Sequence, residues 1–189
     1  MKIGLLFGSF NPIHNGHISI ARYFLEHTAL ETIWFIVSPQ NPFKKEDELL
    51  SAEQRLGLLK KALENETGMQ ASDAEINMPV PSFTIYTLNY LAKEYPGNEF
   101  SIIMGTDNFT QFHKWKDHIE IVNRFKIYVY PRKGNSGGEF QNHPNVQMIH
   151  SPLLDISAGM IREIIKKGET NPWIPEKVFR EIQEKGYYR

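Results

Sequence analysis

Residues 3–17 read IGLLFGSFNPIHNGH, and this stretch decides the fold of the chain. Residues 3–7 form a continuous apolar run, which is typical of a strand buried on both faces. Residues 8–17 supply glycines and two histidines, and an apolar pattern with helical spacing follows them. Glycines let backbone N–H groups approach an anion, and the start of a helix carries a partial positive charge. The order of strand, glycine loop and helix therefore predicts a site for a phosphate of a bound nucleotide.

His14 and His17 are expected at the mouth of this pocket, where their imidazoles can donate hydrogen bonds to non-bridging phosphate oxygens. One alternative is a metal-binding pair, but no third His, Cys or acidic ligand follows at metal spacing nearby. Another is a plain turn whose histidines cap the helix, since Asn11-Pro12 and Asn15-Gly16 are turn-forming pairs. The phosphate interpretation is favoured because a strand and a helix both flank the loop.

Length and composition indicate a single domain over residues 1–189, with 41% hydrophobic and 23% charged residues. Lys and Arg total 21 against 22 for Asp and Glu, so no overall basic field attracts a nucleic acid polymer, and a small nucleotide is the better partner. Cys is absent, which excludes disulfides and thiolate metal sites. We expect a cytoplasmic protein without membrane contact, because Met1-Lys2 leads straight into a strand and no apolar stretch approaches the ~20 residues of a membrane span.

The periodicity of apolar residues predicts an α/β fold with a doubly wound, mostly parallel sheet in three layers, helices covering both faces. Strands are expected at residues 3–7, 33–37, 100–104, 125–130 and 146–149. Helices are expected from near Gly16, from about Ala52 behind a capping box at 51–54, up to about Tyr95, over 158–167, and from Pro175 to Gly186. Ligands bind beyond the carboxyl ends of strands in such a sheet, so residues 8–17, 39–50, 105–116 and 131–134 should converge on one crevice.

The first motif resembles the Gly-[Ser/Thr]-Phe-Asp-Pro-x-His-x-Gly-His signature of the adenylyltransferase and cytidylyltransferase superfamily, with Asn11 in place of the usual Asp. That resemblance implies a Rossmann-like nucleotidyltransferase fold. It also implies that His14 and His17 bind the triphosphate of ATP. The further ATP-binding residues that it implies in this loop are Gly8, Ser9, Phe10 and Gly16.

Two later segments resemble the same superfamily. Gly105-Thr106-Asp107 is similar to its Gly-x-Asp element, which implies that Asp107 accepts hydrogen bonds from ribose or adenine; the alternative is that Asp107 caps a helix. Residues 156–162 resemble its Ile-Ser-Ser-Thr-x-Ile-Arg signature, matching at Ile156, Ser157 and Arg162 and departing at 158 and 159. Helices from about residue 158 should then complete the ATP site, with Arg162 on the leaving phosphates. A solvated arginine is the alternative.

Residues 82–88 and 112–116 resemble segments of nicotinate-nucleotide adenylyltransferases. By that resemblance Trp115 stacks on a pyridine ring, while Thr84 and the backbone N–H groups of Ile85 and Lys116 receive its carboxylate or the nearby phosphate. A tryptophan of the core is the alternative for Trp115. Residues 39–45 belong to a long, proline-punctuated connection that we suspect of covering a ligand, where Lys44 either reaches a phosphate or is solvated.

The resemblance covers most of the chain and implies adenylyl transfer from ATP to nicotinate mononucleotide, giving deamido-NAD and pyrophosphate, a step of NAD biosynthesis. Mg²⁺ would arrive with ATP, and the protein needs no metal site of its own. Phosphopantetheine adenylyltransferase is the alternative within the same fold, and a nucleotide-binding regulator without catalysis is an alternative of another class. The sequence leaves the oligomeric state open, a homo-oligomer included.

Overall fold

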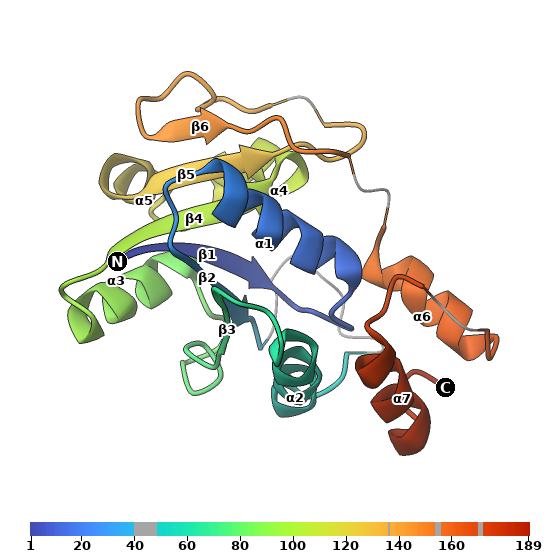
Figure 1. The fold of residues 1–189 in the computed structure, drawn as a ribbon. Helices are drawn as coiled ribbons and strands as arrows, with labels where there is room; N and C mark the ends of the chain where they lie inside the picture. The colour runs from blue at the N-terminus through green and yellow to red at the C-terminus, as the bar shows by residue number, and fades with distance from the viewer. Residues whose placement is uncertain (40–48, 136, 154–155, 170–171) are drawn as a thin grey trace.

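A computed structural model describes residues 1–39, 49–135, 137–153, 156–169 and 172–189. Its centre is a six-stranded sheet in the order β3-β2-β1-β4-β5-β6, in which every neighbouring pair is parallel (Figure 1). The strands are β1 (Lys2–Gly8), β2 (Thr32–Val37), β3 (Met69–Ser72), β4 (Glu99–Gly105), β5 (Lys126–Tyr130) and β6 (Val146–Met148). The α/β fold with helices on both faces of the sheet is therefore confirmed.

Alternate residues of the strands feed two separate apolar cores. On β1, Leu6 belongs to one core, whereas Ile3 and Leu5 belong to the other. The first core is covered by α1 (Asn15–His27), α2 (Ala52–Leu63), α6 (Ala158–Lys166) and α7 (Glu176–Lys185). The second is covered by α3 (Thr84–Glu94), α4 (Thr106–Thr110), the 3-10 turn η1 (Phe112–Lys114) and α5 (His118–Arg124). The molecule thus has the three expected layers.

The structure confirms the signals that were predicted to begin α2 and to end α7. Ser51 and Gln54 form the reciprocal capping box that begins α2. Pro175 is the N-cap of α7, and Gly186 ends that helix with a left-handed φ of 66°. Two features were not predicted: the short edge strand β3, and the division of the segment after β4 into α4, η1 and α5.

The order of the strands reverses at β1, which has β2 on one side and β4 on the other. Residues that follow β1 and β4 therefore meet at the point where sheets of this kind bind ligands. Helices α6 and α7 lie at the end of the molecule toward which the arrow of β1 points (Figure 1). None of the helices in the described part of the chain is both long and apolar enough to span a bilayer.

Gly4 provides a test of how tightly the sheet packs. A Cβ at this position of β1 would lie 2.7 Å from Cδ1 of Ile103 and 2.8 Å from Cδ1 of both Ile33 and Leu30. We expect Gly4→Ala to lower the free energy of unfolding by about 1–3 kcal/mol, because three buried side-chain ends would have to shift within a packed core. Gly57→Ala is the matched control, since nothing lies within 4 Å of that position on α2. It should raise stability by up to about 1 kcal/mol in denaturant titrations. Equal effects of the two substitutions would contradict the packing argument.

Candidate active site

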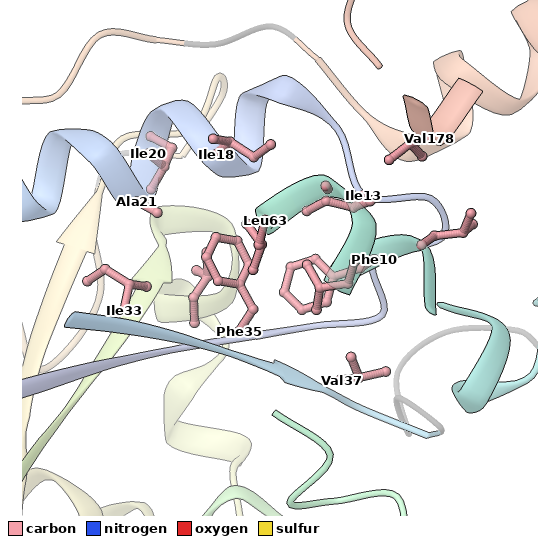
Figure 2. Close-up of a cluster of buried hydrophobic side chains, with 14 of the residues drawn as sticks. Phe10, Ile13, Ile18, Ile20, Ala21, Ile33, Phe35, Val37, Leu63 and Val178 are labelled. Carbon is pink, nitrogen blue, oxygen red and sulfur yellow. The ribbon is translucent and has the colours of Figure 1, made fainter. Parts of the chain in front are cut away.

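The loop between β1 and α1 is fixed by its own core residues. Phe10 has a φ of 45°, in the left-handed region that side chains other than glycine rarely adopt. Its ring is buried, lies 5.6 Å from the ring of Phe35 and meets the His17 ring edge-on at 5.1 Å. Figure 2 shows Phe10 among the apolar side chains between α1 and the sheet. The side chain of Phe10 is thus part of the core, and only its backbone is available to a nucleotide.

The two predicted histidines are stacked. The His14 and His17 rings have centroids 3.7 Å apart, and His14 is only 3% exposed at the N-cap of α1. A Cβ on Gly16 would approach His14 Nδ1 to 3.0 Å, so the glycine of the motif makes room for this ring. Burial and the nearby Arg132 guanidinium lower the pKa of His14 to about 3. At neutral pH His14 is therefore an uncharged imidazole that offers one N–H donor.

Helix α6 is brought to the same loop. Ser157 caps this helix by accepting a hydrogen bond from Met160 N at 3.2 Å, and Ile156 is buried beside Gly16. Arg162 Nη1 donates to the carbonyl of Asn11 at 2.9 Å. Arg162 is half-buried, so the alternative of a fully solvated arginine is wrong. The C-terminal helices thus join the first motif, although they lie about 150 residues further along the chain.

Three of the predicted acceptor residues line one pocket beside this loop, and Ile85 is not among the residues that line it. Thr84, Trp115 and Lys116 share it with Gly8, which ends β1. Thr84 and Ile85 begin α3, where the N–H groups of the first turn have no partner within the helix. The Ile85 side chain is buried in the core, so its N–H is the group that can serve a ligand. Trp115 is half-buried. It lies 5.6 Å from the Phe112 ring and also lines the pocket, so it packs on the core with one part and borders the pocket with another.

The pocket is lined by an ammonium and a buried carboxyl, those of Lys116 and Glu75. The Lys116 ammonium donates to the Tyr86 hydroxyl and lies 5.0 Å above the Phe83 ring. Glu75, which sequence reasoning missed, is 2% exposed and accepts hydrogen bonds from Thr87 at 2.7 Å and Ser82 at 3.1 Å. Burial raises the pKa of Glu75. No pattern in the sequence marks this carboxyl, because its partners Ser82 and Thr87 lie 7 and 12 residues further along the chain and reach it only in the folded protein.

Asp107 and Arg132 both lie against Gly105 at the end of β4. A Cβ on Gly105 would lie 2.4 Å from Asp107 Oδ1 and 2.7 Å from Arg132 Cγ, so glycine is required there. The N-cap of α4 is Gly105, and the alternative that Asp107 caps this helix is wrong. Arg132 was not predicted as a site residue, although it belongs to the segment 131–134 after β5. Lys44 lies outside the described residues.

Known proteins resemble this chain over its full length. A family model described as cytidylyltransferase-like matches residues 5–164. The "Probable nicotinate-nucleotide adenylyltransferase" of Cytophaga hutchinsonii is 43% identical over 189 residues, which cover 100% of this chain and 98% of the relative. The protein of the same name from Flavobacterium johnsoniae is 42% identical over the full length of both chains. The chain belongs to the nicotinate-nucleotide adenylyltransferases of the cytidylyltransferase-like family.

A solved structure supports the architecture of this nicotinate-nucleotide adenylyltransferase. The Plasmodium falciparum nicotinic acid mononucleotide adenylyltransferase complexed with NaAD superposes with a TM-score of 0.84, covering 99% of this chain and 97% of that chain. The two sequences are 18% identical, so the likeness shows a shared fold. The Rossmann-like, doubly wound arrangement predicted from the sequence is confirmed.

The buried His14 predicts a pH dependence of stability. Its pKa is about 3 in the folded protein and near 6.5 when unfolded, so between these values only the unfolded chain binds a proton at this residue. The free energy of unfolding should fall as the pH is lowered from about 6 to 4, with His14 contributing about 1.4 kcal/mol per pH unit. His14→Gln should remove this part of the slope in denaturant titrations. Parallel pH profiles for the two proteins would contradict the assignment.

Proposed function

We propose that this enzyme transfers the adenylyl group of ATP to nicotinate mononucleotide and releases pyrophosphate. An oxygen of the acceptor's phosphate attacks the α-phosphorus of ATP in line. The new P–O bond forms while the bond from the α-phosphorus to the oxygen of the pyrophosphate breaks. The attacking phosphate is already ionised, so the reaction needs no general base and no covalent enzyme intermediate. The protein contributes position and charge stabilisation.

The observation that carries this proposal is the contact between the histidine loop and the acceptor pocket. Gly8 ends β1, lines the pocket and leads directly into the loop that bears His14 and His17. A nucleotide triphosphate on the loop would therefore present its α-phosphorus to an acceptor in the pocket. The identity of the chain with its named relatives over their full length supports the same reaction.

The acceptor end has the groups that a pyridine carboxylate requires. Trp115 offers an aromatic face, and the first turn of α3 offers the N–H groups of Thr84 and Ile85 together with the Thr84 hydroxyl. Helix N-termini favour negative charge, and Lys116 adds an ammonium on the same side. These features support nicotinate mononucleotide, which carries a carboxylate, as the acceptor.

The part of the site proposed to bind the triphosphate combines neutral and charged hydrogen-bond donors. His14 is uncharged, so it donates a hydrogen bond without adding charge, while Arg162 and Arg132 supply the cations near the loop. Helix α6 points its N-terminus, capped by Ser157, toward the same place. Among the described residues no group of three His, Asp or Glu is arranged to hold a metal ion. Mg²⁺ would therefore enter with ATP as part of the substrate, held by the phosphate oxygens.

Acceptor selectivity tests the proposal directly. N–H groups at Ile85 and Lys116 satisfy a carboxylate, but they meet the NH₂ of the amide donor to donor. We expect kcat/KM for nicotinate mononucleotide to exceed that for nicotinamide mononucleotide by about 10- to 100-fold, since unpaired buried groups cost about 1–3 kcal/mol each. Trp115→Ala should raise the acceptor KM for both nucleotides, and Trp115→Phe, which keeps an aromatic face, should restore most of the affinity. Equal values for the two nucleotides, or activity with phosphopantetheine alone, would refute the substrate assignment.

His17 tests the triphosphate end. Removing one donor that stabilises charge at the reacting phosphate should lower kcat by about 10²-fold in His17→Ala, with the acceptor KM unchanged. His27→Ala is the matched control, because this exposed histidine lies at the other end of α1. Pyrophosphate release measures both variants. Near-native turnover of His17→Ala would remove this residue from the mechanism.

A further inference from the structure

The last but one residue of the chain reaches the nucleotide loop. Tyr188 is 8% exposed, and its hydroxyl donates to Asn11 Oδ1 at 2.7 Å. The two residues are 177 positions apart in the sequence. Tyr188 has a φ of 62°, so the chain adopts the unfavourable left-handed region in order to direct this side chain inward after α7.

Asn11 is the residue through which Tyr188 can act on the loop between β1 and α1. Its Oδ1 also accepts from Leu50 N at 3.3 Å, and its carbonyl accepts from Arg162 Nη1 at 2.9 Å. It directly follows Phe10, whose φ of 45° is the strained position of the loop. Such a conformation persists only where its surroundings hold it from several sides. On the other side of Phe10, Arg55 Nη1 donates to the Ser9 carbonyl at 2.6 Å.

The chemistry of the pair is suited to a fixed contact. Burial raises the pKa of the Tyr188 hydroxyl, which therefore stays a neutral donor. A buried donor and acceptor hold each other because either one left alone would lose its hydrogen bond to water without replacement. The contact thus adds a third segment of the chain, the one that follows α7, to the two that hold Asn11 through Leu50 and Arg162.

We propose that Tyr188 is a positioning residue for adenylyl transfer: through Asn11 it holds the left-handed loop that aligns His14 and His17 with the triphosphate. This inference rests on the proposed function, because its readout is turnover in the same reaction. In this role Tyr188 acts from its buried position beneath the loop and needs no contact with either nucleotide. Its effect is transmitted by the loop backbone, where small displacements change the rate of phosphoryl transfer strongly.

The first experiment is Tyr188→Phe, which keeps the ring and removes only the hydroxyl. We expect kcat to fall about 10-fold with the acceptor KM unchanged, since misplacing a reacting group by about 1 Å costs up to about 10² in rate. Tyr187→Phe is the matched control: the neighbouring ring also packs on the core, and kcat should stay within about twofold of the native value. Unchanged kcat in Tyr188→Phe would overturn the proposal, whatever happens to its melting temperature.

A double-mutant cycle separates positioning from general stabilisation. In an Asn11→Ala background, Tyr188→Phe should lower kcat no further, because the contact is already absent. In an Asn11→Asp background, which keeps the acceptor oxygen, it should still lower kcat about 10-fold. If Tyr188→Phe lowers kcat by the same factor in both backgrounds, its effect does not pass through Asn11. Tyr188 would then have a structural role only, and the proposal would be overturned. The native protein is assayed alongside: if it fails to release pyrophosphate with nicotinate mononucleotide, the proposed function fails, not the contact.

Discussion

A buried guanidinium is the constraint on which the rest of the site depends. Arg55 on α2 has no exposed surface, and it donates to four backbone carbonyls, those of Ser9, Ser38, Pro39 and Leu50. A buried charge is tolerated only when its hydrogen bonds are satisfied, and carbonyls satisfy it here. One side chain thereby ties together the nucleotide loop, the end of β2 and the start of α2. Its charge also adds a fixed positive potential beneath a site for phosphates.

The basic residues near the site do not all carry a positive charge, although the sequence alone gives no reason to distinguish them. His14 is buried against a stacked partner and close to Arg132, and both effects keep it neutral. The arginines then carry the positive charge, while the histidines supply directional donors. This division follows from burial, which the motif alone does not reveal.

The sequence predicted the parts of the fold that local chemistry determines. The loop at 8–17, the capping box of α2 and the end of α7 at Gly186 all depend on neighbouring residues. Strand β3 was missed because it is four residues long at the sheet edge, with Ser72 alone fully buried. Glu75, Arg132 and Tyr188 were missed for another reason. Their partners lie on other elements, so only the folded chain brings each residue to its place.

The departures from the family signatures have separate physical meanings. At Asn11 the side-chain oxygen accepts from Tyr188 and Leu50, as a carboxylate would, so the amide keeps these contacts without placing a negative charge beside phosphates. At Gly159 a Cβ would meet only Ser157 Oγ, at 3.9 Å, so the missing hydroxyl of the signature is not a consequence of crowding. In the proposed function, α6 therefore offers its backbone N–H groups and Arg162 to the phosphates. The helix and the Asn11 carbonyl fix these groups, so the proposed phosphate contacts do not depend on the hydroxyls that the signature has at positions 158 and 159.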